Sequence, residues 1–146
     1  MLDLFAGSGQ MGLEALSRGA ASAMFVDASD AAIAAVKRNA QKARLFERAK
    51  YLISDYRNYL RKTRGGAPFS LVFLDPPYAM GAVPEALARL LDYELVTPDC
   101  IFVCESAEPD LFVGKEELGA RFVTRKSGKY GKVYTHILTL KETNEG

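Results

Sequence analysis

A cluster of four residues in this 146-residue chain has the composition of a reactive site: Asp75-Pro76-Pro77-Tyr78. It directly follows an apolar run at residues 71–74, which predicts a buried strand. Proline has a fixed φ and no amide hydrogen, and it also restricts the residue before it, so the strand must stop at Asp75. A carboxylate, a backbone carbonyl and an aromatic ring held together at a strand end suit a planar group that carries an amine, such as a nucleobase.

A glycine turn near the start of the chain indicates a second half of the same site. Gly7, Gly9 and Gly12 satisfy the G-x-G-x-x-G pattern after a predicted strand and at the opening of a predicted helix. Such a turn lets a ligand approach the backbone closely. Asp27 ends the next predicted strand, where an acid can accept both hydroxyls of a ribose. A dinucleotide dehydrogenase and an adenosylmethionine enzyme fit this pattern equally well.

Two further acids separate these alternatives. Asp3 precedes the glycines within the first strand, where its carboxylate can neighbour the ammonium group of an amino-acid cofactor but would repel a pyrophosphate. Asp55 ends the third strand and is suitably placed for the exocyclic amine of an adenine. Either acid alone is more often a helix cap or a turn former. With Asp27 and Asp75, however, four strands end in acids on one sheet edge, which favours the adenosylmethionine enzyme.

Strand and helix patterns alternate along the chain, and this order positions the acids. Residues 121–125 and 133–140 alternate in polarity and are joined by the turn-rich residues 126–131, which predicts an antiparallel hairpin. The fold class is therefore α/β, with a mostly parallel twisted sheet, helices on both faces and an antiparallel strand near one edge. Strands are predicted at residues 1–5, 23–26, 51–53, 70–74 and 101–103 with neighbours up to Glu105, and helices at residues 10–18, 30–43, 56–62 and 83–91.

The composition bounds the class of protein. A hydrophobic fraction of 49% and a charged fraction of 25% are ordinary for a globular protein, and the length suits one domain over residues 1–146. No apolar run is as long as a membrane span and no leader opens the chain, so a cytoplasmic protein is expected. Cys100 and Cys104 would lie roughly 13 Å apart in a strand and are expected to be core residues. With His136 as the single histidine, no metal site is expected.

The net charge of +1 conceals a segregation of charge along the chain. A basic stretch at residues 37–48 is interpreted as a solvated helix face. Near the carboxyl end, a second group of bases contains no acid, and its charges alone support a solvated face and a polyanion contact equally. This second group consists of Arg121, Arg125, Lys126, Lys129 and Lys132.

The motifs together carry a family resemblance. With Asp3-Leu4-Phe5-Ala6-Gly7-Ser8-Gly9, Asp27, Asp55 and Asp75-Pro76-Pro77-Tyr78 in this order, the chain resembles the class I adenosylmethionine-dependent amino-methyltransferases. More narrowly, it resembles the bacterial family that methylates guanine N2 of 16S ribosomal RNA. Glu105 and the turn Lys129-Tyr130-Gly131 are also similar to that family.

The resemblance implies a Rossmann-like, seven-stranded sheet with a reversed last strand. It also implies S-adenosyl-L-methionine as the methyl donor, and ribosomal RNA or the small ribosomal subunit as the partner. Members carry an amino-terminal segment ahead of the position of Met1, so this chain is expected to be an N-terminally short form of the domain.

The resemblance further implies a role for each site residue. Asp75 and Pro76 would hold the target amine, Tyr78 would stack on the base, and Pro77 is expected beside the RNA. The charge pattern, not the resemblance, makes Arg125, Lys126 and Lys129 candidates for RNA contact. The cofactor would be bound by Asp3, Phe5, Gly7, Ser8, Gly9, Asp27, Asp55 and Tyr56.

Several alternatives stay open at this point. The same strand-end signature occurs in enzymes that methylate adenine N6 or glutamine side chains. A methyltransferase fold that holds RNA or a partner without turnover is a second reading. A nicotinamide-dependent oxidoreductase would explain Gly7, Gly9, Gly12 and Asp27, but it would leave Asp75-Pro76-Pro77-Tyr78 without a role.

Overall fold

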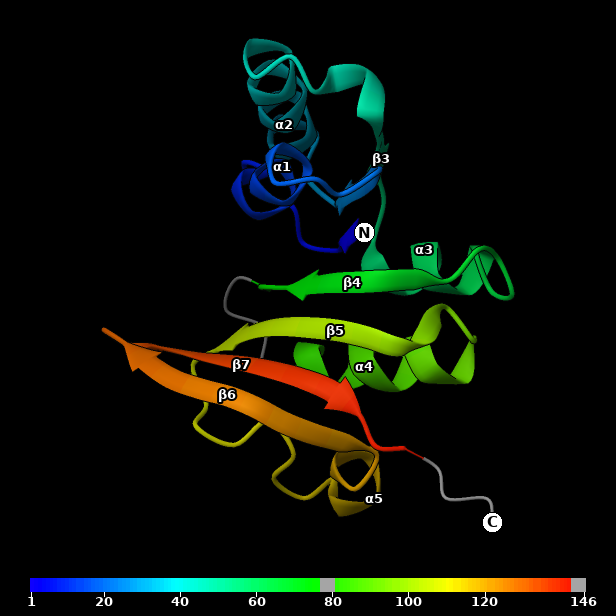
Figure 1. The fold of residues 1–146 in the computed structure, drawn as a ribbon, viewed down its shortest axis with the longest axis vertical. Helices are drawn as coiled ribbons and strands as arrows, with labels where there is room; N and C mark the ends of the chain where they lie inside the picture. The colour runs from blue at the N-terminus through cyan, green and yellow to red at the C-terminus, as the bar shows by residue number, and fades with distance from the viewer. Residues whose placement is uncertain (77–80, 143–146) are drawn as a thin grey trace.

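The computed structural model describes residues 1–76 and 81–142 (Figure 1). Its centre is a seven-stranded sheet with the strand order β3-β2-β1-β4-β5-β7-β6. β1 to β5 run parallel, whereas β7 is antiparallel to both β5 and β6. The predicted fold class is therefore confirmed. The strands are β1 Leu2–Asp3, β2 Ala23–Asp27, β3 Ala49–Ile53, β4 Phe69–Leu74, β5 Val96–Ser106, β6 Phe122–Tyr130 and β7 Val133–Leu140.

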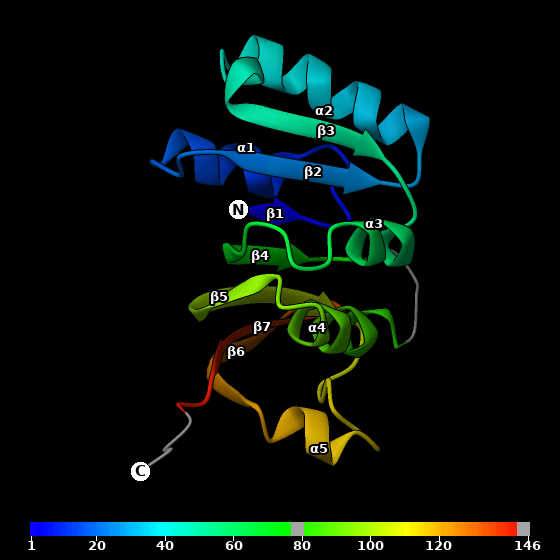
Figure 2. The ribbon, with the colours of Figure 1, turned by 90° about the vertical axis from the view of Figure 1, so that its right-hand side faces the viewer.

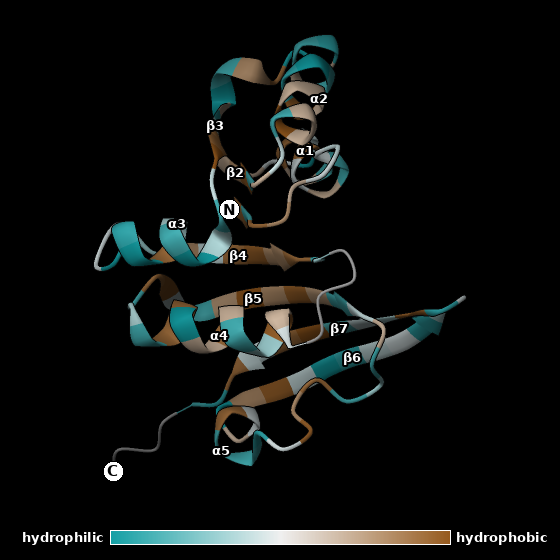
Figure 3. Ribbon diagram, turned by 180° about the vertical axis from the view of Figure 1, so that it is seen from behind, coloured by the Kyte–Doolittle hydropathy of each residue, from teal (hydrophilic) through white to brown (hydrophobic). Residues whose placement is uncertain are grey.

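Helices cover both faces of the sheet (Figure 2). α1 and α2 pack against β1, β2 and β3 on one face, while α3 and α4 lie on the other face. The helices carry many hydrophilic residues, whereas β4 and β5 are largely hydrophobic (Figure 3). No helix within residues 1–76 and 81–142 is long and apolar enough to cross a bilayer. The helices are α1 Gln10–Ser17, α2 Asp30–Lys42, the 3-10 helix η1 Phe46–Arg48, α3 Tyr56–Lys62, α4 Ala82–Asp92 and α5 Glu116–Gly119.

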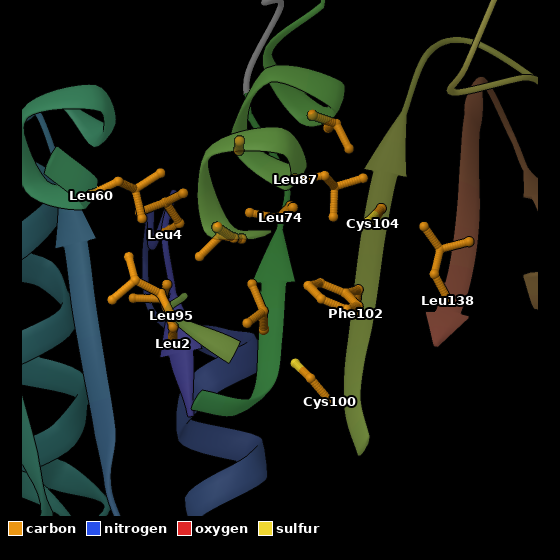
Figure 4. Close-up of a cluster of buried hydrophobic side chains, with 14 of the residues drawn as sticks. Leu2, Leu4, Leu60, Leu74, Leu87, Leu95, Cys100, Phe102, Cys104 and Leu138 are labelled. Atoms are coloured by element: carbon orange, nitrogen blue, oxygen red, sulfur yellow. The ribbon is translucent and has the colours of Figure 1, made fainter. Parts of the chain in front are cut away.

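The sheet has a separate core on each face because side chains alternate along a strand. On β2, Phe25 packs among residues of α1 and α2, whereas Val26 belongs to the core under α3 and α4. This second core is the larger one and extends across β1, β4, β5 and β7 (Figure 4). It contains Cys100 and Cys104, which are free and buried as the sequence predicts.

The face of β4, β5 and β7 opposite α4 is open. In the part of the chain that the structure describes, no helix lies over it (Figure 1). Leu71 and Phe73 of β4 pair there with Ile101 and Val103 of β5, and Ile101 is 43% exposed. Phe73 and Val103 also line the cavity described below, so the site opens onto this face.

The hairpin turns at a different place from the one that the sequence predicts. Residues 126–130 were expected in a loop, but they continue β6 and pair with Val133–Ile137 of β7. The turn is reduced to Gly131 and Lys132, with Gly131 at φ 65°. Pairing with β7 outweighs the low strand propensity of residues 126–130, because each of these residues gains a cross-strand partner. The register shifts between Thr124 and Lys126, which places Arg125 in a bulge.

Candidate functional site

Four strand ends meet around a cavity of about 310 Å³. β1, β2, β4 and β5 each bring an acid to it: Asp3, Asp27, Asp75 and Glu105. The turn at residues 5–8 and the start of α1 complete its lining. The acids converge because parallel strands end on the same edge of a sheet, where open α/β folds bind their ligands.

The glycines of the first turn satisfy the geometry of this edge. Gly7 and Gly9 have φ values of 56° and 79°, a region that residues with a Cβ atom rarely adopt. A Cβ atom on Gly9 would lie 2.8 Å from Val36 Cγ1, and one on Gly12 would lie 2.4 Å from Phe25 Cε1. The G-x-G-x-x-G spacing therefore serves the close packing of the turn and α1 on β2 and α2.

Asp3 is a buried acid at the floor of the cavity, with 4% of its surface exposed. Its Oδ2 accepts a hydrogen bond from the Gly12 N–H at 3.2 Å. Burial, together with the nearby Asp75 and Asp27, raises the pKa of Asp3 from 3.8 to about 7, against the effect of the Gly12 hydrogen bond. An acid desolvated in this way is stabilised in its ionised form by a cation placed beside it.

Asp27 is held by two backbone donors. Its Oδ2 accepts the Gly7 N–H at 3.0 Å and its Oδ1 accepts the Ser29 N–H at 2.9 Å. Ser29 in turn caps α2, since its Oγ accepts the Ala32 N–H at 3.2 Å. Each carboxylate oxygen of Asp27 keeps a further lone pair, so two ligand hydroxyls can donate to it.

Asp55 and Tyr56 lie at the start of α3 and are not among the described residues that line this cavity. Asp55 caps the helix, with Oδ1 accepting the N–H groups of Arg57 at 2.9 Å and Asn58 at 3.3 Å. The ring of Tyr56 packs against that of Phe5 with centroids 5.0 Å apart, and Phe5 does line the cavity. That Asp55 and Tyr56 border an adenine stays a prediction.

The acids of β4 and β5 lie next to one another. Asp75 is exposed, and burial together with the Asp75 carboxylate raises the pKa of Glu105. Pro76 lines a second cavity of about 580 Å³, and Glu105 lines this cavity as well as the first. Pro77 and Tyr78 lie outside the described residues, so their expected roles stay predictions.

The predicted RNA-contacting bases lie on β6, at the edge of the sheet and two strands away from β5. Arg125, Lys126 and Lys129 are exposed, and none of them lines the two cavities. Arg125 Nε donates to Thr139 Oγ1 at 2.8 Å, and Lys129 Nζ lies 5.5 Å from the centroid of the Tyr134 ring. The structure therefore separates these bases from the acids of the strand ends.

Sequence reasoning missed the support behind Phe5. The Tyr56 hydroxyl donates to Glu85 Oε2 at 2.7 Å, and Arg57 donates two hydrogen bonds to the same carboxylate at 2.7 and 2.8 Å. Hydrogen bonds from Arg57 and Tyr56 lower the pKa of Glu85 to about 2. This cluster joins α3 to α4. No local sequence pattern predicts it, because Glu85 lies on a different helix from Tyr56 and Arg57.

A family model described as "Conserved hypothetical protein 95" matches residues 1–139. A solved structure titled "putative methylase" from Haemophilus influenzae superimposes with a TM-score of 0.82 at 25% identity, over 97% of this chain and 86% of that chain.

Several curated relatives match as well. "Putative rRNA methyltransferase YlbH" of Bacillus subtilis is 36% identical over 127 residues, which is 86% of this chain and 67% of the relative. "Ribosomal RNA small subunit methyltransferase D" of Haemophilus influenzae is 30% identical over 106 residues, which is 72% of this chain and 55% of the relative. The chain thus spans between about half and two thirds of these proteins.

Proposed function

This chain belongs to the family described as conserved hypothetical protein 95, and on that premise we propose that it transfers a methyl group from S-adenosylmethionine to an amine of ribosomal RNA. The observation that carries the proposal is the convergence of Asp3, Asp27 and Asp75 on one cavity. The first two acids suit the cofactor and the third suits the amine. The Bacillus and Haemophilus relatives are both named as rRNA methyltransferases, which supports the same chemistry.

The acids of β1 and β2 fit S-adenosylmethionine. The raised pKa of Asp3 marks a buried carboxyl that lacks a compensating cation, and the ammonium group of the methionine part supplies one. Asp27 is fixed at the cavity with lone pairs free for the two hydroxyls of a ribose. Bound there, S-adenosylmethionine would supply an electrophilic methyl group on its sulfonium.

The same acids disfavour a dinucleotide. A pyrophosphate at the start of a helix needs free backbone N–H groups and a positive field. Here the Gly12 N–H donates to Asp3 and the Gly7 N–H donates to Asp27, so carboxylates already take these donors. Two phosphate charges would lie against these acids, which argues against a nicotinamide-dependent oxidoreductase.

Asp75 and Pro76 would act on the amine. An exocyclic amine is a poor nucleophile because its lone pair is delocalised into the ring. Asp75 Oδ and the Pro76 carbonyl would each accept one N–H, which favours a pyramidal nitrogen and directs its lone pair at the methyl group. These hydrogen bonds strengthen as the nitrogen gains positive charge, so they stabilise the transition state more than the ground state. A C–S bond breaks, an N–C bond forms, and the nitrogen then loses one proton.

For the acceptor we propose the N2 amine of a guanine in small-subunit ribosomal RNA. The name "Ribosomal RNA small subunit methyltransferase D" of the Haemophilus relative supports the RNA, although the chain spans 55% of that protein. The exposed bases Arg125, Lys126 and Lys129 on β6 supply a surface that suits the phosphate backbone. The acids at the strand ends lie away from this surface, so they do not repel phosphates that bind to it.

Incubation of the protein with small ribosomal subunits and methyl-labelled S-adenosylmethionine tests the proposal. The subunits should come from cells in which the corresponding gene is deleted, so that the acceptor is unmethylated. After digestion to nucleosides, mass spectrometry should find the label in N2-methylguanosine. Label in N6-methyladenosine would replace guanine by adenine as the acceptor. Cofactor binding without any labelled nucleoside would instead favour the reading as a non-catalytic RNA-binding module.

A further inference from the structure

Glu105 occupies a position that the proposed chemistry does not yet use. The cavity of about 310 Å³ that holds Asp3 and Asp27 and the cavity of about 580 Å³ beyond Pro76 have one described lining residue in common, which is Glu105. Asp75 lines the first cavity and Pro76 lines the second. The boundary between the two cavities therefore carries two neighbouring carboxyl groups and the Pro76 backbone.

The second cavity has walls that suit a flat base. Val83 and Pro84 of α4 line one part of it, and Leu111 and Val113 line another. Val113 is 73% exposed, so the cavity has an apolar edge that is open to solvent. Glu108, Asp110 and Lys115 also line the cavity, and largely apolar walls with a small number of placed polar groups are the usual form of a small-ligand site. A base that enters this cavity edge-first would meet Glu105, with Asp75 across the boundary in the first cavity.

Two carboxylates side by side select one pattern of base edge. Guanine presents two adjacent donors on its Watson–Crick edge, N1–H and the N2 amine. Adenine and cytosine each present a donor next to a ring-nitrogen acceptor, whose lone pair would point at a carboxylate. A carboxylate can only accept hydrogen bonds when ionised. The pair formed by Asp75 and Glu105 therefore matches guanine alone among bases that carry an exocyclic amine.

Resting on the function proposed above, we propose that Glu105 is a specificity-determining residue whose carboxylate accepts the N1–H of the target guanine while Asp75 accepts an N2–H. The electrostatics of the pair agree with this role. Burial, the charge of the neighbouring Asp75 and a hydrogen bond with its carboxylate raise the pKa of Glu105, so both groups ionise together only at a cost in the free protein. The N1–H and N2–H groups of guanine, placed beside the two carboxylates, offset the cost of ionising both. No other base with an exocyclic amine offers a donor to each carboxylate.

A base analogue tests this assignment. The methylated guanine is first mapped in the small subunit. The subunit is then assembled on RNA that carries either guanosine or 2,6-diaminopurine riboside at that nucleotide. The analogue keeps the N2 amine but has an acceptor at N1. The wild-type protein should methylate the guanosine RNA about 10- to 100-fold faster, the discrimination that one good base contact provides. Glu105→Gln should bring the two rates within about threefold, because an amide both donates and accepts.

Glu116→Gln is the matched control, since it removes the same charge from an exposed position on α5 outside both cavities. It should keep the wild-type preference. The thermal midpoint of Glu105→Gln should equal or exceed that of the wild type, because the substitution removes the like-charge pair, and its adenosylhomocysteine affinity should match that of the wild type. A Glu105→Gln variant with the wild-type preference, or with equal loss on both RNAs, overturns the inference while guanosine methylation by the wild type upholds the proposed function. If the wild type methylates neither RNA, or methylates adenosine, both proposals fall.

Discussion

The two halves of the site hold their acids in different ways. In the cofactor half, formed by Asp3 and Asp27, backbone N–H groups bind the carboxylates at 2.9 to 3.2 Å. In the acceptor half, formed by Asp75, Pro76 and Glu105, two carboxyl groups neighbour each other, and burial together with the Asp75 carboxylate raises the pKa of Glu105. Backbone donors position both carboxylates of the cofactor half before a ligand arrives, although Asp3 still lacks a cation, whereas the acceptor half is a pair of neighbouring carboxyl groups whose repulsion a substrate can relieve.

This difference teaches how the fold divides its work. The glycine turn and the starts of α1 and α2 fix the cofactor half, so its affinity depends on the packing of these elements. The carboxylates of the acceptor half depend on two strand ends and on the amine placed beside them. Substitutions in the two halves should therefore separate cofactor binding from methyl transfer.

The largest effect is expected from Asp75→Ala. This substitution removes one acceptor for the amine, so the rate of methyl transfer should fall by about 100- to 1000-fold, as for other transition-state hydrogen bonds. The affinity for adenosylhomocysteine, measured by calorimetry, should change less than threefold. Asp99→Ala is the control, because Asp99 lies near the opposite end of β5 and is exposed. Equal loss of cofactor binding in Asp75→Ala would show that Asp75 belongs to the cofactor half.

Asp3→Asn should weaken cofactor binding and alter the pH dependence of stability. Loss of a hydrogen bond to a charged group should lower the adenosylhomocysteine affinity by about 10- to 100-fold. The raised pKa means that folded Asp3 still binds a proton between pH 3.8 and about 7, where the unfolded chain has released it. The free energy of unfolding of the wild type therefore falls as pH rises through this window.

In Asp3→Asn the side chain stays neutral at every pH and avoids the cost of ionising a buried carboxyl. The unfolding free energy of this variant should therefore exceed that of the wild type at pH 8 by on the order of 2 kcal/mol. At pH 4 the two should be nearly equal. Urea unfolding at both pH values measures the difference. A variant whose stability tracks that of the wild type at every pH would show that Asp3 is not desolvated.

Gly12→Ala should break the packing on which the cofactor half depends. Its Cβ atom would lie 2.4 Å from the Phe25 ring and 3.1 Å from Asp3 Oδ2. Overpacking of this kind costs about 1–3 kcal/mol of unfolding free energy. In Gly128→Ala the nearest atom is 3.2 Å away on Tyr130, whose side chain is 65% exposed and free to move. That control should change the stability by less than about 0.5 kcal/mol, and equal losses would disprove the packing role of Gly12.

The smallest effect is expected at the hairpin, away from both halves. Arg125→Glu with Lys126→Glu should weaken RNA binding and reduce the salt dependence of log K by about 2, or one per lost phosphate contact. The comparison variant is Arg38→Glu with Lys42→Glu, which reverses two exposed bases on α2. Filter binding at several salt concentrations measures both slopes. An unchanged slope in the first variant would remove β6 from the RNA surface.

Much of the fold follows from local patterns. The strand-end acids Asp27 and Asp75, the glycine turn and the alternation of strands with helices are all local features, and the parallel sheet brings them together by rule. The extent of β6 does not follow in this way. Residues 126–130 have turn-like composition and become strand because β7 supplies a pairing partner.

The site was predictable in part for the same reason. An acid at a strand end can be found from sequence, but whether it caps a helix, as Asp55 does, or lines a cavity, as Asp27 does, depends on how the next helix starts. Glu105 was visible as a strand-end acid, yet its place between two cavities arises from the segment at residues 106–115 folding back beside α4. Contacts of that kind have no local signal.

Calorimetric titration with adenosylhomocysteine at pH 7, in two buffers of different ionisation enthalpy, tests the central claim most directly. The protein should bind one equivalent and release a fraction of a proton, because the ammonium group of the ligand forces the Asp3 carboxyl, whose pKa is about 7, to ionise. The Asp3→Asn variant should release none, and NAD should give no binding heat. Binding of NAD, or adenosylhomocysteine binding with no proton release, would contradict the account.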